Sequence, residues 1–320
     1  MLTRGVSTVG RGNNKFMRSF MKYFKRDWQL YMLLLVPLAF VIVFRYGAYP
    51  YLRLAFMDFR PARGFAGSEW VGFDMFRRAF NDPDFHRALR NSIMFNFADL
   101  LFGFPAPILL ALLFNELRFK TYKKVSQTVL YLPHFLSWTI IASISLSMFR
   151  PLTGMVNIFL RDTLGVIETG IPFLTSPPHW AGTYILVNVW ATMGWGSIIF
   201  LAAMAGIDTE LYEAATVDGA NRFRRMWHIT LPGIRPTIVT LLIINLGRVM
   251  GSNFERLVTM GNVMVREYQY QLAIYIFEKG LSAGQFSLAT SVGLFQSFIG
   301  LVLVVSADRV AKKLGGSGFF

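Results

Sequence analysis

The sequence contains no cysteine, so neither a disulfide framework nor a cysteine metal site can form. Its four histidines, at positions 86, 134, 179 and 228, lack the spacing of metal ligands, and we expect no metal site. Paired carboxylates and a nucleophile with a matching base are also missing, which argues against a membrane enzyme. The chain further lacks the G-x-x-x-x-G-K-[ST] loop that holds nucleotide phosphates, so we expect no nucleotide hydrolysis on it.

Charged residues are scarce at 16% of the chain, whereas apolar residues make up 54%. This composition is typical of an integral membrane protein. A helix needs about 20 apolar residues to cross a bilayer. Six segments approach this length: 28–44, 92–114, 129–149, 184–204, 237–250 and 288–305. The fifth is the shortest and carries Arg248 near its end. We therefore predict an all-α fold, a polytopic bundle of six transmembrane helices.

The net charge of +14 does not indicate nucleic acid, because the basic residues are sorted by side. With six spans, the side that carries both termini holds 18 lysines and arginines in 88 residues, against 13 in 118 on the other side. The positive-inside rule places this first side in the cytoplasm. The predicted parts are a cytoplasmic region 1–27, a membrane domain 28–305 with an external cap 45–91 and a cytoplasmic loop 205–236, and a cytoplasmic tail 306–320.

The N-terminal region contains an amphipathic pattern. Phe16, Phe20 and Phe24 repeat at helical spacing among lysines and arginines. Such a helix is expected to lie on membrane lipid at the cytoplasmic surface. Packing on a partner subunit is the alternative.

A polar and basic stretch, 211–232 (LYEAATVDGANRFRRMWHITLP), separates the fourth and fifth spans. It predicts two short helices, the first capped by Asp208 or Thr209. Asp218 and Gly219 are expected to form the turn. The apolar positions of the second helix follow helical spacing: Ala220, Phe223 and Trp227.

Within this stretch, Glu213, Ala214 and Ala215 are followed at fixed spacing by Gly219, Ile229, Leu231 and Pro232. The pattern resembles the EAA loop of membrane subunits of binding-protein-dependent ABC importers, which docks on the ATPase subunit in the cytoplasm. An ordinary surface helix-turn-helix is the alternative, and the complete spacing favours the importer loop. The resemblance implies an ATPase-coupling role for these residues: Glu213, Ala214, Ala215, Asp218, Gly219, Arg222, Phe223 and Trp227.

Further motifs resemble carbohydrate-importer permeases of the LplB type, a group that includes the maltose permeases. They are 102–107 (FGFPAP), 131–135 (YLPHF), 194–199 (GWGSII) and 205–208 (AGID). The resemblance implies a type I importer permease of the bacterial inner membrane. It also implies these partners: a second homologous permease, a pair of ATPase subunits and an extracytoplasmic solute-binding protein. The implied cargo is an oligo- or polysaccharide, with acidic alginate as a candidate. ATP and Mg are expected on the ATPase, and no cofactor is expected on this chain.

Polar and aromatic side chains inside the spans are candidates for the translocation path. Asp99 and Arg248 are the only charges within the predicted spans, so they either face the bundle interior, near each other or the path, or reach the interface from a helix end. The serines, threonines and tryptophans of the third and fourth spans either line a sugar path or pack helices together. The candidate path residues are Asp99, Trp138, Asn188, Trp190, Trp195, Asn245 and Arg248.

The segment 281–285 (LSAGQ) resembles the signature of ABC ATPases, but the predicted topology puts it outside the cell, and we interpret it as a coincidence. Two other functions are weighed against the saccharide importer. One is an ABC permease for a different solute, such as an amino acid or polyamine. The other is a self-sufficient secondary transporter or channel, which would usually show internal repeats or several membrane carboxylates, whereas only Asp99 is available here.

Overall fold

The structure, a computed structural model, describes residues 26–251 and 253–313. The amphipathic pattern of residues 16–24 lies outside the described residues. Where the chain is described, its regular elements are helices, as predicted, apart from one short antiparallel hairpin. In this hairpin β1 (Met57–Asp58) pairs with β2 (Glu69–Trp70).

The chain forms two compact units that divide after Arg53. The first contains α2 (Trp28–Phe40) and the π-helical turn η1 (Val41–Tyr46), and the 3-10 helix η2 (Tyr49–Phe56) crosses the boundary. The run Trp28–Phe56 is apolar and long enough to cross a membrane. It extends beyond residue 44, where the predicted first span ends.

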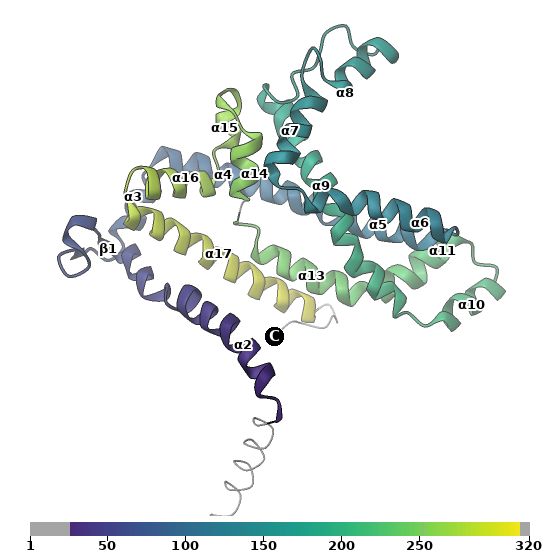
Figure 1. Ribbon diagram of the computed structural model, residues 1–320, viewed down its shortest axis with the longest axis horizontal. Helices are drawn as coiled ribbons and strands as arrows, with labels where there is room; N and C mark the ends of the chain where they lie inside the picture. Colours follow the sequence, from purple (N-terminus) through teal and green to yellow (C-terminus); the bar gives the residue numbers. More distant parts are fainter. Residues whose placement is uncertain (1–25, 252, 314–320) are drawn as a thin grey trace, which may run out of the picture. The chain divides into compact units, whose positions relative to one another are not determined.

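The second unit holds the remaining helices, drawn from blue to yellow in Figure 1. Its first half consists of η3 (Pro61–Arg63), α3 (Asp74–Phe80), α4 (Pro83–Ala98), η4 (Asp99–Gly103), α5 (Pro105–Glu116), α6 (Lys120–Tyr131), η5 (Leu132–Phe135), α7 (Trp138–Phe149), α8 (Met155–Ile158), η6 (Phe159–Thr163) and α9 (Pro177–Ala205). Its second half consists of α10 (Thr209–Val217), α11 (Arg222–Arg225), η7 (Met226–Thr230), α12 (Leu231–Gly233), α13 (Arg235–Gly247), α14 (Phe254–Met260), η8 (Val263–Val265), α15 (Arg266–Gln269), α16 (Leu272–Phe277), η9 (Glu278–Ser282) and α17 (Phe286–Lys313).

Three long apolar helices of this unit contain predicted spans. They are Pro83–Glu116, Pro177–Ala205 and Phe286–Lys313, which include the predicted segments 92–114, 184–204 and 288–305. The first of them is not a regular α-helix throughout, because η4 forms a π-helical turn before α5 restarts at Pro105. The distortion therefore spans Asp99–Gly103 and ends just before Pro105, within the motif 102–107.

The third predicted span is bent, and a second bend lies just before the fifth. Lys120–Phe135 and Trp138–Phe149 meet at 110°, so a single straight helix over 129–149 is wrong. The bend arises where η5 contains Pro133 and the Ser137 side chain caps the next helix by accepting from the backbone of Ile140. Arg222–Gly233 and Arg235–Gly247 meet at 59°. Counting each bent pair as one span gives up to six spans in the part of the chain that is described.

The fifth span is also shorter than predicted. Helix α13 ends at Gly247, and the chain then turns, with the N–H of Gly251 donating to the carbonyl of Arg248 at 2.8 Å. The segment 237–250 is therefore not one continuous helix. A new helix, α14, begins at Phe254.

Helix α9 connects two apolar cores. Near its start, Trp180 and Tyr184 lie in a large cluster that also contains residues of α4, α14 and α16. Near its end, Phe200 and Met204 lie in a smaller cluster with residues of α5 and Ile234. Between the two, Gly194 meets α6 so closely that an added Cβ would lie 1.9 Å from the carbonyl oxygen of Leu130. These contacts fix the position of α9 in the unit.

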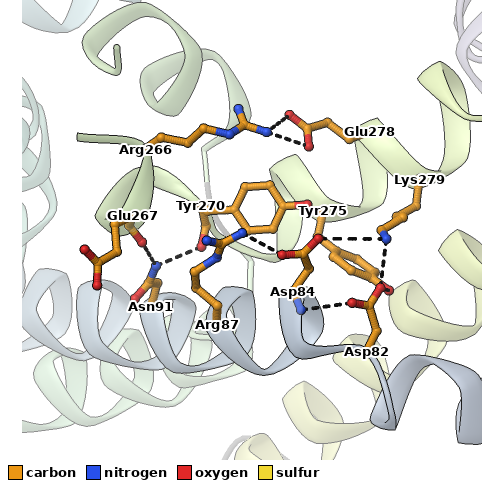
Figure 2. Close-up of polar contacts among 10 residues, drawn as sticks. All are labelled: Asp82, Asp84, Arg87, Asn91, Arg266, Glu267, Tyr270, Tyr275, Glu278 and Lys279. Carbon is orange, nitrogen blue, oxygen red and sulfur yellow. Dashed lines mark hydrogen bonds and ion pairs between the residues drawn. The ribbon is translucent and has the colours of Figure 1, made fainter. Parts of the chain in front are cut away.

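The segment between α14 and α17 is fastened to the start of α4 by polar contacts (Figure 2). The Asn91 side chain donates to the carbonyl oxygens of Glu267 and Tyr270, at 2.6 and 2.9 Å. Lys279 forms an ion pair with Asp82 at 2.8 Å. The LSAGQ segment ends this region as a helix-connecting turn, in which Gly284 has a φ of 68° before α17 begins.

Candidate functional site

The predicted pair of short helices is present at the end of α9. Asp208 caps α10, because its carboxylate accepts the N–H of Glu210 at 3.0 Å. Gly219 has a φ of 75°, a conformation that costs a residue with a side chain about 1–2 kcal/mol. Asn221 then caps α11 by accepting the N–H of Arg224 at 2.8 Å. The sequence interpretation missed this second cap, although an asparagine before a basic helix is a recognisable signal.

Two side-chain contacts hold the arms of this loop together. The hydroxyl groups of Tyr212 and Thr230 lie 3.0 Å apart. The Arg225 guanidinium donates to the hydroxyl of Thr216 at 2.8 Å. The residues Tyr212, Glu213, Thr216, Val217 and Arg225 line a surface hollow of about 400 Å³. The loop is therefore a braced hairpin with Glu213 on one wall of a hollow.

Large apolar side chains on the loop face outward. Phe223 is 78% exposed, Trp227 is 65% exposed and Val217 is 88% exposed. Ala220 precedes α11 instead of lying within it, so the predicted stripe is reduced to the two aromatic residues. Exposed apolar groups that gather on one element mark an interaction surface.

A cavity of about 460 Å³ lies among the central helices. Its wall comes from η4 and α5, from α9, and from α13 with the following turn, together with His134 of η5. This volume falls in the range of small-molecule sites, roughly 300–1,000 Å³. The cavity wall includes Asp99, Gly103, Pro107, His134, Asn188, Thr192, Trp195, Ile199, Asn245 and Arg248.

The structure brings together most of the candidate path residues. Five of them line this cavity: Asp99, Asn188, Trp195, Asn245 and Arg248. The other two, Trp138 and Trp190, pack against the large apolar core instead. Their tryptophan rings fill space between helices, which is the packing alternative that the sequence left open.

Asp99 is held by two side chains from other elements. Arg256 of α14 forms an ion pair with it, with 2.6 Å between Nη2 and Oδ2. Asn188 of α9 donates to Oδ1 at 2.9 Å. Arg248 lines the same cavity, but no ion pair joins it to Asp99 among the residues that the structure covers. A direct Asp99–Arg248 pair, which the two in-span charges suggested, is therefore not formed.

Arg256 is the functional candidate that the sequence did not single out. Its side chain is only 3% exposed, and its guanidinium carbon lies 4.1 Å from the centroid of the Tyr184 ring. The predicted topology placed residues 251–287 outside the membrane, and Arg256 is 157 positions from Asp99. The available signal was an arginine next to Leu257 and Val258 in the short helix Phe254–Met260.

One wall of the cavity carries an aromatic stack. The rings of His134 and Trp195 are parallel to within 5°, with centroids 4.7 Å apart. His134 comes from the bend in the third span and Trp195 from α9. The stack presents a flat surface, and Trp195 is 45% exposed.

The family model for the inner membrane component of binding-protein-dependent transport systems matches residues 85–315. The chain belongs to this family. Protein LplB of Bacillus subtilis (strain 168) is 44% identical over 98% of this chain and 96% of LplB. The polygalacturonan/rhamnogalacturonan transport system permease YteP of the same organism is 40% identical over 91% of this chain and 90% of YteP.

A solved structure is similar over nearly the whole chain. A chain of a bacterial ABC transporter involved in the import of the acidic polysaccharide alginate has a TM-score of 0.80 and 37% identity, covering 92% of this chain and 99% of its own length. A chain of a bacterial alginate ABC transporter, solved with an alginate pentasaccharide-bound periplasmic protein, gives a TM-score of 0.81. The predicted family and the type I permease fold are therefore confirmed.

Proposed function

We propose that this permease subunit moves oligo- or polysaccharide through an ATP-driven importer, together with a second homologous permease and a pair of ATPase subunits. The braced hairpin with outward-facing Phe223 and Trp227 carries the proposal. A rigid element that presents apolar groups outside its own fold is suited to transmit motion from a partner. ATP and Mg would bind on that partner, and this chain would contribute no catalytic residue.

An acidic saccharide is the cargo that the cavity suits best. Relatives of this chain are named for polygalacturonan, rhamnogalacturonan and alginate. In the cavity wall, the carboxylate of Asp99 is compensated by Arg256, while Arg248 is exposed and forms no ion pair with any described residue. A sugar carboxylate can pair with this arginine. The exposed ring of Trp195 adds a flat apolar surface for a sugar ring.

The proposed orientation follows from the loop. Docking on an ATPase requires the hairpin in the cytoplasm, and six spans then place both termini there. The segments 45–91 and 251–287 would face a solute-binding protein on the opposite side. We propose the same division of the chain as the sequence predicts, with the membrane domain over residues 28–305.

Reconstitution of the complete complex in liposomes tests this function. ATP hydrolysis, measured with the solute-binding protein and a panel of acidic and neutral oligosaccharides, is expected to rise most with the acidic ones. Arg248→Gln should raise the KM for acidic saccharide about tenfold, equivalent to about 1.4 kcal/mol, and change the KM for a neutral one far less. An equal effect on both classes would contradict carboxylate recognition. Uptake by the chain alone in liposomes would favour a secondary transporter.

A further inference from the structure

The ion pair between Asp99 and Arg256 joins three elements at one point. Asp99 begins the π-helical turn η4, Arg256 lies on α14, and Asn188 of α9 donates to the same carboxylate. Both guanidinium Nη atoms donate to the carboxylate, at 2.6 and 3.4 Å. A change that moves α14 away from η4 must therefore break two hydrogen bonds and separate two charges.

The surroundings of the pair favour a two-state contact. Arg256 is buried among Tyr184, whose ring centroid is 4.1 Å from its guanidinium carbon, and Trp138, at 5.7 Å. Asp99 is 21% exposed, on the side of the cavity. For a pair with one buried partner, the mutual attraction of the charges roughly offsets the cost of removing them from water. The paired state and an open state in which both charges are hydrated can then be close in free energy, as a gating contact requires.

We call the braced loop of residues 205–236 the coupling hairpin. The pair lies at the end of the cavity that is remote from this hairpin. Along α9, Asn188 is 17 residues before Ala205, where the hairpin begins, a distance of about 25 Å at 1.5 Å per residue. Ile199, another lining residue, is only about 9 Å from that end by the same count. Beyond the pair, Tyr184, Leu257 and Met260 belong to the large buried core.

We propose that Arg256 is a positioning residue that closes the extracytoplasmic end of the cavity by holding α14 against η4 and α9 through Asp99. The inference rests on the proposed function for the direction in which the cavity opens. In the resting complex the pair is formed and the cavity is sealed from outside. In the outward-open complex α14 separates from Asp99 and both charges become hydrated.

The lack of cysteine in this chain permits a direct test in intact cells. The single reporter Ile199→Cys is introduced into the complete complex and treated from outside with a membrane-impermeant maleimide, and labelling is read on this chain alone. Val263→Cys, at a position 89% exposed in the external segment, should label fully, and Val217→Cys, at one 88% exposed on the hairpin, should not label. These two cysteines check the orientation, so a failure of the proposed topology is recognised separately.

The labelling of the reporter in the otherwise unchanged chain is then compared with its labelling in three variant backgrounds. Asp99→Asn combined with Arg256→Gln removes both charges without leaving one of them buried alone, and it should raise external labelling of the resting complex several-fold. Arg256→Lys keeps the charge and should restore most of the protection. Arg266→Gln breaks an exposed ion pair of similar length, the 2.8 Å contact with Glu278, and should leave labelling unchanged.

If Arg256 had only a structural role, the double variant would lower the amount of assembled complex without changing the labelling of the complex that remains. Unchanged labelling of the double variant, in complexes that still contain the ATPase, would overturn the proposal. Equal increases in the double variant and in Arg256→Lys would overturn it as well.

Discussion

The carboxylate of Asp82 connects three separate parts of the second unit (Figure 2). It caps α4 by accepting the N–H of Asp84 at 2.9 Å, accepts the hydroxyl of Tyr275 at 3.0 Å, and pairs with Lys279 at 2.8 Å. Burial raises the pKa of this carboxyl, but the Lys279 ammonium, the Asp84 N–H and the Tyr275 hydroxyl together hold its pKa below the usual value. Burial, with the nearby Asp82 carboxylate, raises the pKa of Tyr275, so the phenol remains a donor.

This arrangement predicts a stability that depends on pH in the acidic range. Because the folded-state pKa of Asp82 is depressed, its stabilisation is fully present above the carboxyl's ordinary pKa of about 3.9 and is lost as the pH falls through the lower, folded value. Asp82→Asn should lower the thermal unfolding temperature of the purified complex at neutral pH. The difference from the parent should shrink as the pH falls below about 4.

Asp58→Asn is a suitable control, since Asp58 makes a more exposed ion pair with Arg60 at 3.3 Å and should have little effect at any pH. A difference for Asp82→Asn that stayed constant down to strongly acidic pH would show that the charge is not what stabilises this contact.

At the scale of single residues, sequence reasoning found the charged side chains of the cavity but not their partners. Asp99 and Arg248 were identified because a charge inside an apolar segment is costly. Arg256 was missed because the pairing depends on how α14 packs against η4, and no local pattern encodes a contact over 157 positions. The caps at Asp208 and Asn221 are local, and the first was predicted.

At the scale of elements, two of the three glycines of α9 differ in their surroundings and provide a matched test. A Cβ on Gly194 would lie 1.9 Å from the carbonyl oxygen of Leu130, whereas a Cβ on Gly182 would meet nothing within 4 Å. Gly194→Ala should destabilise the subunit by about 1–3 kcal/mol, because α6 must move away. Gly182→Ala should be neutral or stabilise by about 0.5–1 kcal/mol, because alanine favours helix.

These effects are measured by thermal unfolding of the two variants in detergent, monitored as the fraction of complex that remains folded. If Gly194→Ala unfolds at the parent temperature, α6 and α9 do not pack as closely as their backbones indicate.

The straight spans were easier to predict than the bent ones. Long apolar runs mark α9 and α17 directly, since hydropathy depends on composition. The 110° bend before Trp138 leaves the apolar run uninterrupted, so hydropathy alone cannot reveal it. The bend has two local causes, Pro133 and the cap by Ser137. Both are compatible with several bend angles, so they do not predict the angle.

At the scale of the whole molecule, the coupling hairpin should control assembly with the ATPase. Phe223→Ala and Trp227→Ala each remove an exposed aromatic side chain, and a central aromatic contact typically contributes about 2 kcal/mol or more to an interface. Each variant should reduce co-purification of the ATPase while the subunit itself still reaches the membrane.

Phe73→Ala provides the control, because Phe73 is 74% exposed but lies in the segment expected on the opposite side of the membrane. Loss of the ATPase in this variant, or its retention in both hairpin variants, would show that the hairpin is not the docking element.

The contact between Gly194 and the backbone of Leu130 also limits how the transporter can change shape. The three atoms nearest to a Cβ added at Gly194 all belong to the backbone of Leu130 and Tyr131, so a change of side-chain rotamer cannot relieve this contact. Two helices in direct backbone contact are expected to move together as one rigid body. We therefore expect a change of shape to occur at the 110° bend between Phe135 and Trp138, and a ligand that stiffens this bend should slow the transport cycle.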